Sequence, residues 1–268
     1  MTRLFAARVP ARRIVAPLAV VLAAVAGSCT EIGTNPATVT ALEFDSLPYP
    51  AVVTGDTLRD SLGNASPLSA TAFNVNDAAI PHPVISYLAL DSGLTISSSG
   101  IVTAQLRNGS VRVIASVPGL QSTVEHLLVV RRPDTVIVTS ALIDTVFYAV
   151  PDNAGTNVSA ALGLKVVTFD TVGAGSGVPG WLVSYKVLFH GQTLAVTDTT
   201  IASLWNASSA ASLVDTAGTD GSVSPRLRVR STLLPTLAES LTVVATVRYR
   251  GAPVRGSPVT YLIQLRPK

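Results

Sequence analysis

The chain of 268 residues contains a single cysteine, Cys29, so no disulfide can form within it. Charged residues make up only 13 % of the chain and aromatic residues only 5 %. Burial of aliphatic side chains must therefore supply most of the stability of the fold. The three histidines, at positions 82, 126 and 190, are far apart and match no metal-ligand spacing. We expect no metal site.

Motifs of catalysis and cofactor binding are also scarce. Residues 175–180 match G-x-G-x-x-G, but a dinucleotide site needs a helix after these glycines, and here the strand-like run 181–189 follows. A loop is expected instead. No serine stands in G-x-S-x-G, because Ser176 lacks both flanking glycines. The sequence therefore predicts a protein that is not an enzyme and has no cofactor.

The N-terminus has the pattern of an export signal. Four arginines lie within the first 13 residues, the apolar run 14–26 follows, and Gly27 and Ser28 precede Cys29. This segment resembles a bacterial lipoprotein signal, in which a small-residue motif ends in a cysteine that is acylated. Ala26 departs from the leucine that is commoner at its position. The resemblance implies a signal peptide at 1–28, acylation of Cys29 with palmitate among its lipids, and a membrane anchor.

Two other interpretations of this segment are possible. One is an ordinary cleaved secretory signal with an incidental cysteine. The other is a membrane-spanning helix, which is disfavoured because a span needs about 20 apolar residues and Pro17 interrupts this run. A lipoprotein would be extracytoplasmic, and Thr30 after the cysteine is compatible with sorting to a bacterial outer membrane or cell surface. Residues 29–38 are small and polar, as expected of a tether.

Removal of the leader changes the charge. The whole chain has 19 basic and 16 acidic residues, a net charge of +3. Without the four leader arginines it has 15 and 16, a net charge of −1. We therefore expect no nucleic-acid partner.

The remainder of the chain predicts an all-β fold. Strand-like runs recur every 8–15 residues between Gly, Pro, Asn or Asp, as in β-sandwiches. Alternation is clearest at 243–250, where Val243, Ala245, Val247 and Tyr249 share one face. The sequence Arg-Arg-Pro-Asp at 131–134 is the expected boundary between two domains, 39–131 and 132–268. Residues 29–130 have a net charge of −5 and residues 131–268 a net charge of +4.

Each expected domain resembles a bacterial family. In the first, "G-I-V-T-A" at 100–104 precedes a strand ending in Val113-Ile114-Ala115, which resembles the bacterial Ig-like group 2 domain. Gly100 should adopt the positive φ of a tight hairpin turn. In the second, 177–187, Thr219-Asp220-Gly221 and 241–247 resemble the invasin-type, group 1 Ig-like domain. These resemblances imply two tandem Ig-like sandwiches, used in both families as stalks, spacers and adhesive surfaces. Trp181 is expected in the core between sheets and Trp205 at the surface.

One charge pattern suggests a binding surface. Arginines alternate on one expected strand and again on another; they are Arg226, Arg228 and Arg230, and Arg248 and Arg250. If these strands are neighbours, the arginines form a stripe able to bind carboxylates or phosphates. The alternative is an outer face that keeps the sheet soluble. We expect a structural, spacer or adhesive surface protein, or else a non-enzymatic binding protein for an anionic glycan or envelope component. A surface protein is a further possible partner.

Overall fold

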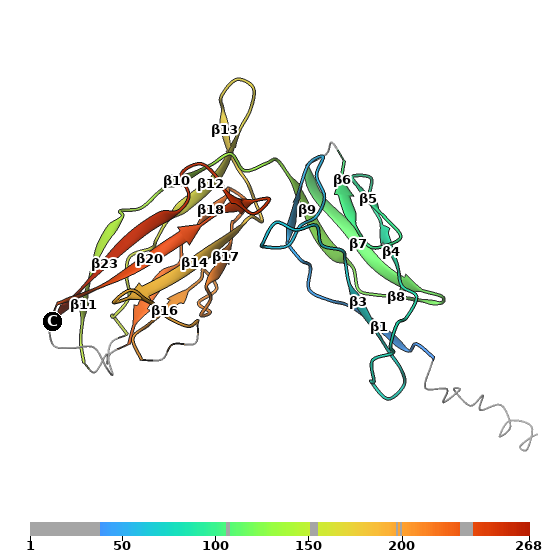
Figure 1. Cartoon of the computed structure of the whole chain (residues 1–268), viewed down its shortest axis with the longest axis horizontal. Helices are drawn as coiled ribbons and strands as arrows, with labels where there is room; N and C mark the ends of the chain where they lie inside the picture. The colour runs from blue at the N-terminus through green and yellow to red at the C-terminus, as the bar shows by residue number, and fades with distance from the viewer. Residues whose placement is uncertain (1–37, 106–107, 151–154, 197, 199, 231–237) are drawn as a thin grey trace, which may run out of the picture.

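The computed structural model describes residues 38–105, 108–150, 155–196, 198, 200–230 and 238–268 (Figure 1). The expected signal peptide, Cys29 and most of the tether lie outside these residues. Within the described part every regular element is a strand, so no helix there is long and apolar enough to cross a membrane. The predicted all-β fold, with sheets packed as in sandwiches, is confirmed.

Strands β1–β9 pair only with one another, and we refer to them as the N-terminal unit. Their bounds are β1 (Ala41–Phe44), β2 (Ala51–Val53), β3 (Ala70–Phe73), β4 (Ser86–Ala89), β5 (Leu94–Ile96), β6 (Val102–Ala104), β7 (Gly109–Val117), β8 (Leu120–Gln121) and β9 (Glu125–Val130). A five-stranded sheet has the order β2-β9-β7-β4, with β8 also on β7, and the pairs β1-β3 and β5-β6 complete the unit.

Strands β10–β23 likewise pair only among themselves and form the C-terminal unit. Their bounds are β10 (Thr135–Val138), β11 (Ile143–Tyr148), β12 (Leu164–Phe169), β13 (Gly175–Gly177), β14 (Leu182–Phe189), β15 (Gln192–Thr193), β16 (Ala202–Trp205), β17 (Val214–Thr216), β18 (Ser222–Val223), β19 (Arg226–Val229), β20 (Glu239–Thr246), β21 (Arg248–Tyr249), β22 (Ala252–Pro253) and β23 (Val259–Pro267). One sheet has the order β11-β23-β20-β14-β15, and another has the order β10-β12-β13.

In both units the first two strands belong to different sheets. In the N-terminal unit β1 pairs antiparallel with β3, and β2 then pairs parallel with the last strand, β9. In the C-terminal unit β10 pairs antiparallel with β12, and β11 then pairs parallel with the last strand, β23. A chain segment that passes from one sheet to the other closes one side of a sandwich. The two units are closed in the same way, between β1 and β2 and between β10 and β11.

Alternation along the strands builds the core, as the sequence predicted. Leu241, Val243 and Ala245 on β20 are buried, and the residues between them are half-buried. Tyr261 and Ile263 on the neighbouring β23 are also fully buried. Because side chains alternate across a strand, these positions face the second sheet and hold the two layers together.

Gly100 takes the expected turn conformation. Its φ is +80°, and its amide donates to the Ser97 carbonyl at 2.9 Å in the β5–β6 hairpin. A Cβ here would lie 3.0 Å from the carbonyl oxygen of Leu68 and 3.2 Å from the Tyr87 ring. Glycine is thus required both by the turn and by the close packing around it.

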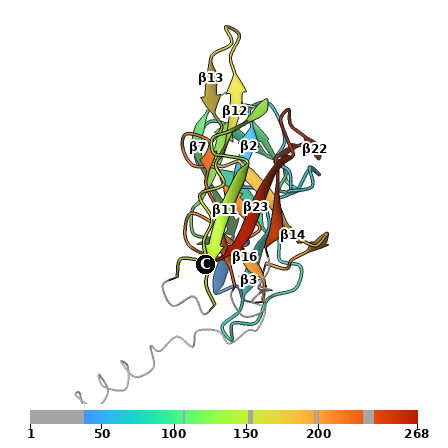
Figure 2. The same cartoon turned by 90° about the vertical axis from the view of Figure 1, so that its left-hand side faces the viewer.

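Residues 175–180, expected as a loop, are partly a strand. β13 pairs with the end of β12, and the resulting hairpin extends beyond the rest of the C-terminal unit in both views (Figures 1 and 2). Gly177 lies directly against the backbone of Asp220 and Gly221, where a side chain would not fit. Gly177 therefore serves close backbone packing.

Asp215 on β17 is buried at 8 % exposure although it has no cationic partner in the described part of the chain. Its Oδ1 accepts from the Thr216 amide at 3.0 Å, but neither its Oδ2 nor the nearby buried Tyr185 hydroxyl has a hydrogen-bond partner there. Burial raises the pKa of Asp215 above its ordinary value of 3.8. The ionised carboxylate is therefore an unfavourable feature of the folded state at neutral pH.

We expect Asp215→Asn to stabilise the protein by about 1 kcal/mol at pH 7, because the amide keeps Oδ1 and removes the buried charge. Since the folded-state pKa is raised, protonated Asp215 contributes to the stability of the folded state below pH 3.8. This stability is lost as the pH rises through the folded-state pKa. The difference in stability between Asp215→Asn and the wild-type protein should thus decrease as the pH falls, as measured by thermal unfolding at several pH values. Asp220→Asn, at an exposed carboxylate bonded to Ser222, should give no stabilisation. Equal stabilisation by both variants would contradict this account.

Candidate functional site

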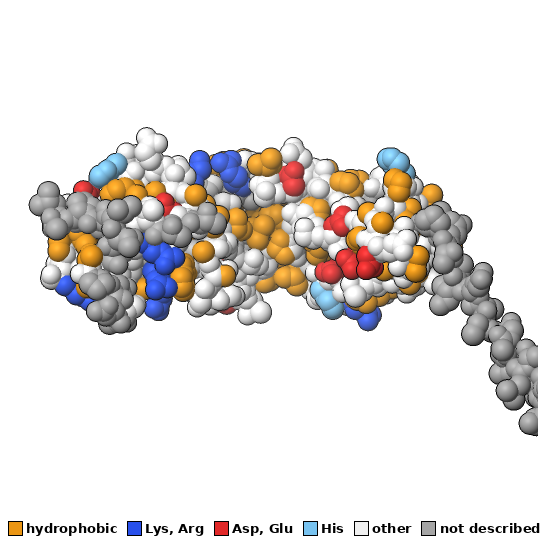
Figure 3. All heavy atoms as spheres, turned by 90° about the horizontal axis from the view of Figure 1, so that it is seen from below, with side chains coloured by type: hydrophobic (Ala, Val, Ile, Leu, Met, Phe, Trp, Pro, Cys, Tyr) orange, Lys and Arg blue, Asp and Glu red, His pale blue; other side chains and the backbone are white. Residues whose placement is uncertain are grey.

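The two units meet at a joint formed by loops of the N-terminal unit and by β14 and the β21–β22 hairpin of the C-terminal unit. Seen from below, apolar side chains gather where the units meet, and acidic side chains are more frequent on the N-terminal unit (Figure 3). The joint has three parts: a buried carboxylate, a group of aromatic rings and close backbone contacts. Each part joins residues that are far apart in the sequence.

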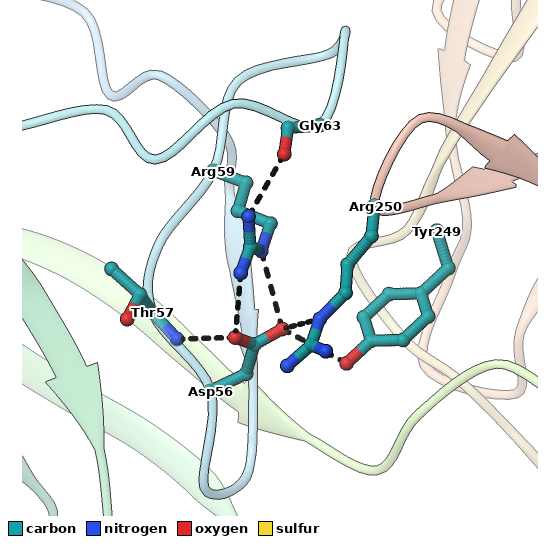
Figure 4. Close-up of polar contacts among 6 residues, drawn as sticks. All are labelled: Asp56, Thr57, Arg59, Gly63, Tyr249 and Arg250. Carbon is teal, nitrogen blue, oxygen red and sulfur yellow. Dashed lines mark hydrogen bonds and ion pairs between the residues drawn. The ribbon is translucent and has the colours of Figure 1, made fainter.

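Asp56 is the polar centre of the joint (Figure 4). It is only 7 % exposed and accepts five hydrogen bonds. Two come from the other unit: Arg250 Nε and the Tyr249 hydroxyl each donate to Oδ2 at 2.9 Å. The other three come from its own unit, from the Thr57 amide at 2.8 Å and from Arg59 at 3.1 and 3.3 Å. One carboxylate thus binds two guanidiniums and a phenol across the joint.

The electrostatics favour the ionised acid strongly. Burial by itself would raise the pKa of Asp56, but the hydrogen bonds from Arg250, Arg59, Thr57 and Tyr249 outweigh it and hold the pKa well below its usual range. The same contact raises the pKa of Arg250 above its ordinary value. The pair therefore stays charged, and the joint stays bonded, throughout neutral and mildly acidic pH.

Aromatic rings form the apolar part of the joint. Trp181, 5 % exposed, lies with its ring centroid 5.1 Å from that of Tyr49 and 6.2 Å from that of Tyr249. Its Nε1 donates to the Arg248 carbonyl at 3.1 Å, and the Leu182 amide donates to the Tyr49 hydroxyl at 2.8 Å. Burial raises the pKa of Tyr49, so its hydroxyl stays neutral. Trp181, expected between the sheets, is buried instead where the two units meet.

Glycines let the two backbones approach each other. A side chain on Gly63 would collide with the backbone of Gly251, and one on Gly251 would lie 2.8 Å from the Leu62 carbonyl oxygen. Gly180, with φ +68°, similarly receives the side chain of Leu128, whose Cδ1 would be 2.6 Å from an added Cβ. The space left inside the joint is about 40 Å³, enough for water but small beside ligand pockets of about 300–1,000 Å³. The joint is built to hold two units together.

The five arginines singled out from the sequence are not one stripe. β19 pairs with β16, whereas β21 pairs with β22, so the two strands are not neighbours. Arg250 has φ +50° and lies in the turn after β21, which removes it from the strand alternation. Arg250 bonds Asp56, and Arg248 Nη1 donates to the Gly251 carbonyl at 2.8 Å. Both therefore serve the joint.

The other three arginines lie on or directly after β19. Arg226 is exposed, and Arg228 is half-buried with its Cζ 4.8 Å from the centroid of the Trp205 ring. Trp205, expected at the surface, is half-buried, and its Nε1 donates to Ser203 Oγ at 2.9 Å. Arg230 is half-buried, and its Nε is buried with no hydrogen-bond partner among the described residues.

The sequence singled out neither Asp56 nor Tyr49, and it marked Tyr249 only as part of an alternating strand face. The one signal pointing to them is the opposite net charge of the two parts of the chain, because an acidic unit and a basic unit can share a bonded ion pair. That signal indicates attraction between the units but does not say which residues make the contact.

No protein-family model matches the chain, and no curated protein matches it in sequence. Solved structures similar to it include domains 4 and 5 of the S-layer protein SbsC, at 14 % identity over 86 % of this chain and 100 % of that chain, with a TM-score of 0.29. The Yersinia pseudotuberculosis adhesin InvE is 12 % identical over 83 % of this chain and 58 % of that chain, with a TM-score of 0.33. Cadherin domains 1–4 of protocadherin gamma B7 are 13 % identical over 68 % and 41 %, with a TM-score of 0.30.

Proposed function

We propose that the protein is a lipid-anchored, extracytoplasmic and non-enzymatic spacer with a structural or adhesive role at the cell surface. Residues 39–131 and 132–268 are its two Ig-like domains, of the group 2 and invasin types, and Cys29 carries the lipid that holds it on the membrane. The observation that carries the spacer role is the bonded joint at Asp56, which joins the two units through charge, aromatic packing and close backbone contacts. The N-terminal pattern that ends in Cys29 supports the anchor.

A fixed joint is what distinguishes a spacer from two loosely tethered domains. Neighbouring domains usually move relative to each other unless their interface is well packed. Here a buried carboxylate bonds two residues of the other unit, and Trp181 packs against tyrosines of both units. Residue 38, where the described chain begins, belongs to the N-terminal unit. An anchor at Cys29 would therefore make the C-terminal unit the distal, presented part.

The anchor is tested in a bacterial membrane fraction. We expect the wild-type chain to enter the detergent phase with the intact mass of residues 29–268 plus its acyl chains. Cys29→Ser removes the acyl acceptor, so this variant should leave the detergent phase and lack the added mass, since stable anchoring needs more than one acyl chain. A Cys29→Ser chain that stays in the detergent phase, or a wild-type chain that keeps residues 1–28, would overturn the anchored spacer.

A further inference from the structure

A hollow of about 610 Å³ lies on the C-terminal unit, apart from the joint. Trp205, Arg226 and Arg228 line it, together with polar residues that include Asn206 and Ser224. Its volume lies within the usual range of ligand sites, about 300–1,000 Å³.

Strand register places the aromatic ring and the arginines on one face. Trp205 is directly opposite Arg226 in the antiparallel β16–β19 pair, and Ser203 is opposite Arg228. Because side chains alternate, these four residues share a face, whereas Leu204 and Leu227 on the other face are buried in the core. The stacked Arg228 and the bond from Nε1 to Ser203 hold the indole in place beside Arg226.

The positive charge of the hollow is not neutralised within the described part of the chain. The ion pairs there involve the arginines at positions 59, 112, 132 and 250 and the pair His190–Glu239, and none involves Arg226 or Arg228. Two guanidiniums beside an aromatic ring can bind a carboxylate or sulfate while the ring packs against an apolar ligand surface. The flat faces of sugar rings supply such a surface, and inorganic phosphate does not.

We propose that this hollow binds an acidic saccharide, with Arg226 and Arg228 on its carboxylate or sulfate and Trp205 against a sugar ring. Asn206 and Ser224 add polar groups to the lining of the hollow, although Oδ1 of Asn206 already accepts from the Ser208 and Ala210 amides. This site is independent of both the anchor and the joint, so it can fail without affecting the proposed spacer.

Calorimetric titration of the full chain in detergent tests the site. The probes are a galacturonate tetramer, its methyl-esterified form, a sulfated heparin tetrasaccharide and inorganic phosphate. We expect saturable binding of an acidic tetramer, at least tenfold weaker binding of the methyl ester, and weakening with added salt. Comparison of the galacturonate and heparin probes separates carboxylate from sulfate recognition, and either one supports the proposal.

Matched variants locate the binding. Arg226→Gln and Arg228→Gln should each weaken it at least tenfold, whereas Arg255→Gln, which removes an exposed charge elsewhere on the same unit, should leave it unchanged. Trp205→Leu should weaken it, and Trp205→Phe, which keeps an aromatic face, should retain most of it, with the fold checked by circular dichroism. Absence of binding to both acidic probes, equal losses with Arg255→Gln, or equally tight binding of phosphate would overturn the proposal.

Discussion

Replacement of Trp181 by alanine is expected to lower the free energy of unfolding by about 3–5 kcal/mol, the usual range for removing a buried tryptophan. The expected loss is large because the ring is only 5 % exposed and packs against Tyr49 of one unit and Tyr249 of the other. The substitution would leave a cavity. It would also remove the hydrogen bond to the Arg248 carbonyl and leave that acceptor without its indole donor. Thermal and urea unfolding measure the loss.

The second tryptophan provides a matched control. Trp205 is half-buried, and its hydrogen bond is to Ser203 on its own strand, so Trp205→Ala should cost clearly less than Trp181→Ala. Because the chain has only these two tryptophans, a Trp205→Phe background also reports Trp181 alone by fluorescence. Its emission should be that of a buried indole and should shift to the red when the joint opens. Equal losses for the two alanine variants would mean that the joint adds little stability.

Local features of the fold were predictable from the sequence because they depend on a few consecutive residues. Alternation at Val243, Ala245, Val247 and Tyr249 indicated which side of the strand would be buried. The first three side chains are buried, whereas Tyr249 lies on the separate strand β21 and is half-buried. Gly100 indicated a tight hairpin turn, and its φ of +80° confirms the turn. In both cases the physical cause, strand pleat or backbone sterics, acts within one strand or one turn.

The joint could not be predicted in this way. Asp56 and Arg250 are 194 positions apart, and both belong to turns whose placement depends on the packing of whole sheets. The arginine pattern shows the same limit. Alternation placed Arg226 and Arg228 on one face of β19, but whether β19 lies beside β21 depends on the strand order. The periodicity of a sequence predicts the faces of a single strand, whereas a binding site depends on which strands and loops lie next to each other.

The opposite charges of the two parts of the chain acquire a structural meaning at Asp56. Its partner Arg250 comes from the basic unit, and burial of the carboxylate means that water competes only weakly for the contact. Tyr249 adds a neutral donor to the same oxygen, Oδ2, so the carboxylate is satisfied from both units. The attraction between the acidic and the basic unit and the hydrogen bonding across the joint therefore meet at Asp56.

Asp56→Ala should lower the free energy of unfolding by about 2–3 kcal/mol, since it leaves Arg59, Arg250 and the Tyr249 hydroxyl without their acceptor. The matched control is Asp91→Ala, which breaks a 2.8 Å ion pair with the exposed Arg112 and the hydrogen bond from the Arg112 amide, both within one unit. An exposed pair contributes little, so the control should change stability less and leave the joint intact.

The same pair of variants tests whether Asp56 keeps the joint rigid. Because Cys29 is the only cysteine, spin labels can be placed on a Cys29→Ser background at Thr95 and Lys186, which are exposed on β5 and β14 of the two units. Double electron–electron resonance should give a narrow distance distribution for this background and for Asp91→Ala, and a broad one for Asp56→Ala.

The depressed pKa means that ionised Asp56 contributes stability above pH 3.8, which is lost only as the pH falls through the lower folded-state pKa. The distribution should therefore be the same at pH 7 and pH 5. A distribution that is broad before any mutation, or that Asp56→Ala leaves narrow, would show that this carboxylate does not fix the angle between the units.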